Sequence, residues 1–230
     1  MGSAQVGRIF GIPIVLDVTF ILLVVLYGMH HFTSGNLAGI SYGVVLVAGV
    51  AFSILLHELG HALAARIWRV PTAYIELNGL GGLCHFARNM PIDRVANIVM
   101  LLAGPAANLL LWQVFSNAGD WMLQSSSGQP DRTAFLLKQL GQVNFLLFVF
   151  NLMPAHPLDG GRTLVQIFSK FIGYDRAMRV VGYLGLLVAL WLVFLALGGQ
   201  MFAAIIAFVL FQANIEVLQT HGGPRWTRWN

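Results

Sequence analysis

The sequence predicts an all-α polytopic membrane protein with about six transmembrane helices and a short re-entrant β-hairpin or loop after the second. Of its 230 residues, 57% are hydrophobic and only 10% are charged, whereas soluble domains average about 25% charged residues. Apolar stretches of the length that spans a bilayer, about 20 residues, occur six times. We expect helices near residues 12–32, 38–67, 95–115, 134–153, 178–197 and 201–219.

The positive charges predict how these helices are oriented. If the amino terminus is cytoplasmic, eleven of the 13 lysines and arginines fall in cytoplasmic segments, and only Arg132 and Lys138 fall outside. The eleven are Arg8, Arg66, Arg69, Arg88, Arg94, Arg162, Lys170, Arg176, Arg179, Arg225 and Arg228. Membrane proteins usually carry this excess on the cytoplasmic side. We expect a multi-pass protein of the cytoplasmic membrane with both termini in the cytoplasm, in contact with lipid and not with nucleic acid.

The second apolar stretch contains His57-Glu58-Leu59-Gly60-His61. Residues four apart share one face of a helix, so His57 and His61 can bind one metal ion while Glu58 stands beside them as a general base. Zinc held in this way lowers the pKa of a bound water to about 7. A carboxylate in a membrane-length helix is costly and needs a reason. We therefore predict one Zn²⁺ per chain, near the cytoplasmic side, and peptide hydrolysis; two structural histidines bonded to carbonyls are the alternative.

Two histidines leave the zinc one protein ligand short. The candidates further along the chain are Glu76, Cys84, His85, Asp93, His156 and Asp159. Asp159 is favoured because Pro154 and Pro157 end the preceding helix, and Gly160 and Gly161 let the chain turn back. Asp159 would then return to the depth of the histidines on irregular backbone. Zinc with neutral histidines and ionised Glu58 and Asp159 also sums to zero charge. His156 is the main rival.

Two further segments have their own signatures. Residues 72–77 alternate as a strand does, and the glycines that follow suit a turn, so we expect a hairpin whose 72–77 edge pairs with an extended substrate. An ordinary cytoplasmic loop is the alternative. The third apolar stretch contains Gly104-Pro105-Ala106-Ala107-Asn108, where the proline predicts a kink and Asn108 places an amide in the bundle. Residues 119–132 indicate a polar outer loop.

Three motifs together resemble the site-2 protease family of intramembrane zinc metalloproteases. They are residues 57–61, 104–108 and 151–161, in this order on three consecutive stretches. The resemblance covers about residues 38–162, which we expect to be the catalytic core of a single domain, 1–230. The helices at 12–32, 178–197 and 201–219 are then peripheral. The sequence has no room for the PDZ or nucleotide-sensing domain of many relatives, so we expect a compact form.

The resemblance implies a role for each motif residue. His57, His61 and Asp159 would hold zinc and Glu58 would be the general base. The groups beside the substrate would be Asn151, Asn108, Gly81 and Gly82. The implied partner is a single-pass transmembrane substrate, such as a transcription regulator or anti-sigma factor, cut in regulated intramembrane proteolysis. A zinc-binding transporter or non-catalytic scaffold, and a protease of exposed chain ends with Glu76 as third ligand, stay open, as does the oligomeric state.

Overall fold

The computed structural model describes residues 2–33, 35–79, 81–87, 93–125 and 131–220. Its elements are β1 (Ser3–Ile9), β2 (Ile12–Asp17), η1 (Val18–Phe20), α1 (Ile21–Phe32), α2 (Leu37–Ile67), β3 (Thr72–Asn78), β4 (Gly81–Phe86), α3 (Arg94–Ser125), α4 (Arg132–Asn151), α5 (Asp159–Ile172), α6 (Tyr174–Leu197) and α7 (Met201–Gln219). Three of the arginines used to predict orientation, Arg88, Arg225 and Arg228, lie outside the described residues. The chain divides into two compact units, residues 1–88 with 103–148 and residues 89–102 with 149–230.

The amino-terminal segment corrects the prediction of an all-α protein. The expected first transmembrane helix, 12–32, begins as strand β2 and becomes α1 only at Ile21. β1 and β2 pair antiparallel across a turn at Phe10 and Gly11, whose φ angles of 52° and 81° suit the twist of a two-residue hairpin. A short apolar run fits a strand as well as a helix, and the Gly11 turn was the available signal.

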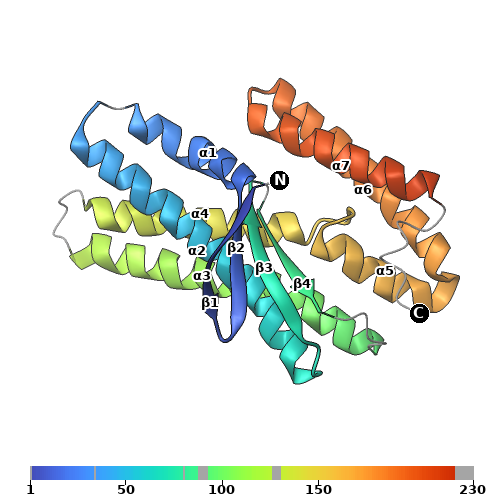
Figure 1. Ribbon diagram of the computed structural model, residues 1–230. Helices are drawn as coiled ribbons and strands as arrows, with labels where there is room; N and C mark the ends of the chain where they lie inside the picture. Colours follow the sequence, from blue (N-terminus) through green and yellow to red (C-terminus); the bar gives the residue numbers. More distant parts are fainter. Residues whose placement is uncertain (1, 34, 80, 88–92, 126–130, 221–230) are drawn as a thin grey trace. The chain divides into compact units, whose positions relative to one another are not determined.

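The four strands form one sheet in the order β1-β2-β3-β4 (Figure 1). β2 and β3 are parallel, and β3 and β4 form the antiparallel hairpin that the sequence predicts after the second helix. The edge that the sequence analysis assigned to the substrate is wrong, because β3 (Thr72–Asn78) is paired on both sides. β4 is the strand that lies at the edge of the sheet on this side.

The first unit has its core between this sheet and α2. Ile14 and Ile75 from the sheet join Val50 and Ile54 from α2 in one buried cluster. The hairpin is also fixed at its turn, because the backbone N–H of Gly79 donates to Thr19 Oγ1 at 3.1 Å. The 31 residues of α2 make a helix about 46 Å long. The hairpin is therefore held against a long helix that carries the histidine motif.

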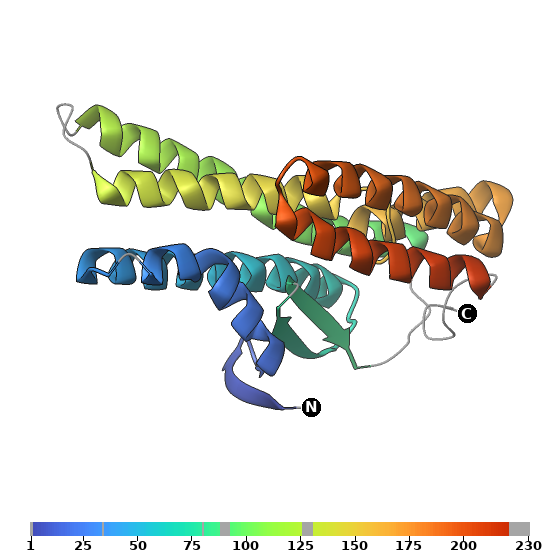
Figure 2. The ribbon, with the colours of Figure 1, turned by 90° about the horizontal axis from the view of Figure 1, so that it is seen from above.

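The second unit contains α5, α6 and α7. A turn at Gly198 and Gly199 joins α6 to α7, which run antiparallel side by side (Figure 2). Their packing buries apolar residues of both helices, among them Leu192 and Leu210, and a second cluster that includes Val181 and Val217 also takes in α5. The buried polar residues of this unit are His156, Asp159, Thr163 and Asn214.

Helix boundaries differ from the prediction at two places. Asp159 is the first residue of α5, and Gly160 and Gly161 lie inside that helix instead of turning the chain. A Cβ on either glycine would overlap the backbone of Leu152 or Ala155, so both glycines serve close packing. Helix α3 continues to Ser125, so the first part of the expected outer loop, 119–125, is helical. The rest of that loop, 126–130, lies outside the described residues.

Among the described residues, four helices are long and apolar enough to cross a membrane: α2, α3, α4 and α6. They correspond to four of the six expected transmembrane helices. In α7 the apolar part, Ala203–Gln219, is shorter. Helix α1 has 12 residues and is only about 18 Å long, less than the ~30 Å hydrocarbon core of a bilayer.

Candidate metal centre

His57 and His61 lie one above the other on α2, as the helix period requires. Their side chains converge, with the two Nε2 atoms 3.1 Å apart and the rings edge to face at an interplanar angle of 82°. Both residues are at least nine-tenths buried, and so is Glu58 between them in sequence. Two ring nitrogens that meet in this way can share one metal ion.

Asp159 is the third member of this group. One ligand atom each from His57, His61 and Asp159 lie within 4.8 Å of one another, and all three residues are buried. In the described part of the chain this is the one group of three or more such residues with metal-site spacing. The other candidates from the sequence, Glu76, Cys84, His85, Asp93 and His156, do not belong to it.

A chain of buried polar side chains determines which nitrogen of His57 carries the proton. Asn108 Oδ1 lies 2.5 Å from His57 Nδ1, and Asn108 Nδ2 donates to Asn144 Oδ1 at 2.9 Å. Asn144 Nδ2 donates to Ser53 Oγ and to the carbonyl of Leu140, both at 2.9 Å. Ser53 Oγ donates in turn to the carbonyl of Gly49 at 2.8 Å.

The two carbonyls at the end of this chain fix its direction, because a carbonyl can only accept. Asn144 must therefore present its oxygen to Asn108, and Asn108 must present its own oxygen to His57 Nδ1. His57 Nδ1 then carries the proton, and the lone pair of Nε2 is available to a metal. Asn108, Asn144 and Ser53 are fully buried, so water does not compete for these bonds. The immediate partner of Asn108 is thus a histidine, and its predicted contact with substrate stays a prediction.

Glycines allow the backbone to approach this group from two sides. Gly104 on α3 leaves space next to the histidines, since a Cβ there would lie 2.6 Å from His57 Nε2. Gly60 on α2 likewise lets the carbonyl of Ala103 on α3 come close, since a Cβ at Gly60 would lie 2.6 Å from that oxygen. On the hairpin, a Cβ at Gly82 would lie 2.5 Å from Glu58 Cγ. The β4 backbone therefore passes directly against the Glu58 side chain.

The remaining candidates occupy other surroundings. Glu76 and His85 lie on the hairpin, where Glu76 Oε2 is 3.5 Å from His85 Nε2 and the His85 ring stacks on Tyr74. Burial, and secondarily the charge of Arg162, lowers the pKa of His156 to about 4, so this imidazole is neutral at pH 7. Asn151 is the last residue of α4, eight residues before Asp159. Its predicted contact with substrate stays a prediction.

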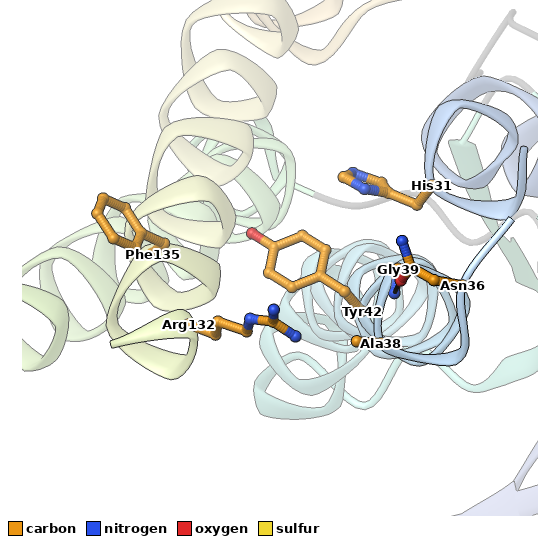
Figure 3. Close-up of a pocket in the computed structure, with 7 residues that line it drawn as sticks. All are labelled: His31, Asn36, Ala38, Gly39, Tyr42, Arg132 and Phe135. Carbon is orange, nitrogen blue, oxygen red and sulfur yellow. Dashed lines mark hydrogen bonds between the residues drawn. The ribbon is translucent and has the colours of Figure 1, made fainter. Parts of the chain in front are cut away.

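A hollow of about 380 Å³ lies at the opposite end of α2 (Figure 3). Tyr42, one of its lining residues, points from α2 toward α4, and its hydroxyl donates to Gln139 Oε1 at 2.8 Å. The lining residues are His31, Asn36, Ala38, Gly39, Tyr42, Arg132 and Phe135. They include no carboxylate and only one imidazole, so this hollow lacks the donor set of the centre around His57.

The sequence model of peptidase family M50 matches residues 45–123 and 121–193. The chain belongs to this family. A zinc metalloprotease of Methanocaldococcus jannaschii is 31% identical over 93% of this chain and 60% of its own length. A putative zinc metalloprotease of Synechocystis sp. is 30% identical over 74% of this chain and 45% of its own length. This M50 chain therefore spans between about half and three fifths of these relatives.

The fold of this M50 chain also has a solved counterpart. The structure of the site-2 protease from Methanocaldococcus jannaschii superposes with a TM-score of 0.65 and 28% identity, over 93% of this chain and 94% of that one. This likeness and the four apolar helices identify the chain as a multi-pass membrane protein. The resemblance to the site-2 protease family that the sequence motifs indicate is confirmed.

Sequence reasoning missed three buried polar residues that make hydrogen bonds in the interior of the protein. Ser53 and Asn144 stand behind His57, and Asn214 lies buried in α7. A signal was present, because Asn144 and Asn214 are amides within long apolar stretches, where polar groups are costly and usually functional. Only Asn108 and Asn151 were singled out from the sequence, since these two belong to recognisable motifs.

Proposed function

We propose that this protein is an intramembrane zinc metalloprotease that hydrolyses a peptide bond within or near the transmembrane segment of a membrane-anchored substrate. The observation that carries the proposal is the buried group of His57, His61 and Asp159, with Glu58 next to His57 on the same helix. The donors fit zinc, since two imidazoles and one carboxylate make up the protein ligands of many catalytic zinc sites. Gly104 leaves open the space beside both imidazoles that a Cβ would fill.

Each ligand has a defined part in this proposal. His57 would bind through Nε2, because its Nδ1 is engaged by Asn108, and His61 would bind through the nitrogen that faces it. Asp159 would bind through a carboxylate oxygen. Bound zinc supplies a Lewis acid that polarises a carbonyl oxygen and lowers the pKa of water to about 7. With Glu58 ionised, the two carboxylates balance the metal charge in a buried site.

Glu58 is the proposed general base. It is buried and adjoins a metal ligand, so its carboxylate can take a proton from the attacking water and later pass that proton to the leaving amine. The close approach of Gly82 keeps the Glu58 side chain between α2 and the β4 backbone. The base and the hairpin are thus neighbours, so a substrate bound along β4 would lie next to the base.

The substrate would bind in an extended form along the edge of β4. A transmembrane helix hides its peptide bonds, since its carbonyls are already hydrogen-bonded within the helix, so the substrate must unwind before it is cut. An extended strand can recover these bonds by pairing with a sheet edge. Within the described residues β4 pairs only with β3, so its outer edge can accept a strand. Gly81 and Gly82 lie on this strand, and in this proposal the substrate passes beside them.

The orientation of the protein is part of the proposal. Counted over the six expected transmembrane helices, the eleven-to-two bias of positive residues supports cytoplasmic termini; four of these six are long and apolar enough to cross a membrane in the described residues. His61 is five residues from Arg66, the positive charge near the end of α2, which corresponds to a depth of about 7 Å below that surface. The active site would therefore lie in the membrane near the cytoplasmic side. A single-pass regulator of transcription or an anti-sigma factor is the substrate class that the family resemblance suggests.

The test compares the wild-type enzyme with Glu58→Gln, in which the amide cannot act as a base. Fragments of membrane proteins would be quantified by proteomics in cells that contain either form, and zinc would be measured in both purified proteins. We expect Glu58→Gln to retain one zinc per chain and to lose cleavage. Cleavage at the wild-type rate would contradict the assignment of the base, and bound zinc without cleavage by the wild-type protein would favour a zinc-binding transporter or scaffold.

A further inference from the structure

Asn214 is a residue of α7 whose side-chain amide makes two hydrogen bonds to the backbone of a loop outside that helix. Its Nδ2 donates to the backbone carbonyl of His156 at 2.8 Å, and its Oδ1 accepts from the backbone N–H of His156 at 3.1 Å. Asn214 is fully buried. A buried amide in an apolar helix is costly unless it is paired, and here the side chain holds one residue of a loop by both its main-chain groups.

The surroundings of Asn214 leave its amide little freedom. Its second Nδ2 hydrogen goes to the carbonyl of Leu210 at 2.7 Å, so both amide hydrogens and the amide oxygen are engaged. On the neighbouring helix α6, Gly185 makes room for it, because a Cβ there would overlap the Asn214 amide. Helices α6 and α7 are thus shaped to hold this amide in one orientation.

The loop that Asn214 holds leads directly to a proposed metal ligand. His156 is three residues before Asp159, and the short segment between them is closed by two bonds, from Leu158 N to the Ala155 carbonyl at 2.9 Å and from Arg162 N to the Leu158 carbonyl at 3.0 Å. Gly161 packs so closely on Ala155 that a Cβ would overlap its carbonyl. A displacement of the backbone at His156 would therefore be passed on to the start of α5.

We propose that Asn214 is a positioning residue for Asp159, which it acts on through the backbone of the 152–158 loop. This inference rests on the proposed function, because it takes Asp159 to be a zinc ligand. The inference gives α7, which the sequence analysis took to be peripheral, a role in positioning a metal ligand. Groups that orient metal ligands typically change metal affinity by about 10- to 100-fold when they are replaced.

The first test replaces the amide. In the full-length protein, Asn214→Leu keeps a similar side-chain volume but leaves both main-chain groups of His156 without their partner. Zinc affinity would be measured by competition with a chelator, unfolding by heat at saturating zinc, and cleavage as kcat and KM. We expect zinc affinity to weaken by about 10-fold or more, with a fall in kcat larger than any change in KM. Val217→Ala, a loss of packing on the same helix, should lower thermal stability without this loss of zinc affinity.

A matched pair of glycine variants covers the case in which Asn214→Leu does not fold. Gly185→Ala would push on the Asn214 amide, whereas Gly182→Ala, three residues earlier on α6, would meet only the side chains of Val217 and Leu218 at 3.0 to 3.3 Å. We expect Gly185→Ala to weaken zinc binding more than Gly182→Ala does. Equal zinc affinity in these two variants, or wild-type affinity in Asn214→Leu, would overturn the inference.

The outcome for the inference can be separated from the outcome for the proposed function. Zinc binding by the wild-type protein and its loss in Asp159→Ala are measured first and need no substrate. If the wild-type protein binds no zinc, the metal centre is wrong and the inference falls with it. If it binds zinc through Asp159 and the Asn214 variants bind zinc equally well, only the inference is wrong.

Discussion

The proposed metal ligands on α2 and the proposed ligand at the start of α5 are positioned by different kinds of structure. His57 and His61 meet because a helix brings residues four apart onto one face. The chain of buried hydrogen bonds through Asn108, Asn144 and Ser53, called the relay below, fixes the proton on His57 Nδ1. Asp159 depends on the path of a loop, whose backbone at His156 is held by a side chain 58 residues further along the chain. The histidine pair is therefore fixed by residues close together in the sequence, whereas the position of the Asp159 carboxylate depends on contacts between residues far apart in the sequence.

This difference determines how each part of the centre can fail. The histidine pair persists as long as α2 stays helical, and its buried hydrogen bonds refine an arrangement that the helix already provides. The helix period does not fix the position of the carboxylate, because the 152–158 loop has to be placed by its contacts with Gly160, Gly161 and Asn214. We expect perturbations around the loop to act first on metal binding.

The largest effect is expected when a ligand of either kind is removed. His61→Ala and Asp159→Ala should both lose stoichiometric zinc and all detectable cleavage, because two protein ligands do not make a stable zinc site. Glu76→Ala is the matched control, since Glu76 is a carboxylate on the hairpin that lies beside His85. Zinc content and cleavage would be measured in parallel. Retained zinc in Asp159→Ala together with lost zinc in Glu76→Ala would assign the third ligand to the hairpin.

Metal removal should reveal that zinc also holds the two kinds of structure together. A ligand present at 1,000 times its dissociation constant stabilises the folded state by about 4 kcal/mol, and without it Glu58 and Asp159 are two buried carboxylates with no cation between them. We expect a chelator to lower the melting temperature of the wild-type protein by several degrees and to leave that of Asp159→Ala unchanged. A wild-type melting temperature that does not respond to chelator would argue against the site.

A smaller effect is expected from the relay behind His57. Asn108→Leu removes the acceptor of the Nδ1 proton and should weaken zinc affinity by about 10- to 100-fold, and Asn144→Leu, one step further away, should weaken it less. Tyr42→Phe is the control, because it deletes a hydrogen bond between α2 and α4 that has no link to the histidines. The comparison with Asn214→Leu would then show directly which ligand is held more loosely. Equal zinc affinity in Asn108→Leu and Tyr42→Phe would remove the relay from the account.

The smallest effect is expected at the hairpin, where Gly82 lies against the Glu58 side chain. Gly82→Ala would place a Cβ against the Glu58 side chain and should slow cleavage by roughly tenfold, since small displacements of catalytic groups have large kinetic costs, with zinc content unchanged. Gly7→Ala on β1 meets open space and should be neutral. Loss of zinc in Gly82→Ala would mean that the hairpin supports the ligands as well.

The local part of the centre could be predicted from the sequence, and the long-range part only through a motif. The spacing of His57 and His61 is sufficient to place both on one helix face. Asp159 was preferred among six candidates because two prolines precede it, but the expectation of irregular backbone there was wrong, since Asp159 begins α5. The two glycines after it, predicted to turn the chain, instead allow close packing. That role depends on neighbours that the sequence does not identify.

The sheet shows a second limit of the same kind. Residues 12–17 are apolar enough to begin a transmembrane helix, and only pairing with β1 and β3 makes them a strand. Because β2 pairs with β3, β3 has a neighbour on both sides, and β4 is the edge strand of the sheet. The substrate edge was therefore assigned to the wrong strand of a correctly predicted hairpin, because strand order is a property of the tertiary fold.

The central claim is that one zinc ion is held jointly by the helix-borne histidines and the carboxylate at the start of α5. Diffraction from crystals of the zinc-loaded protein, collected on both sides of the zinc absorption edge, tests it most directly. We expect a single anomalous peak per chain about 2.0–2.2 Å from a nitrogen of His57, a nitrogen of His61 and an oxygen of Asp159. A peak at another group of residues, or a zinc ion at the histidines with Asp159 beyond coordination distance, would contradict the account.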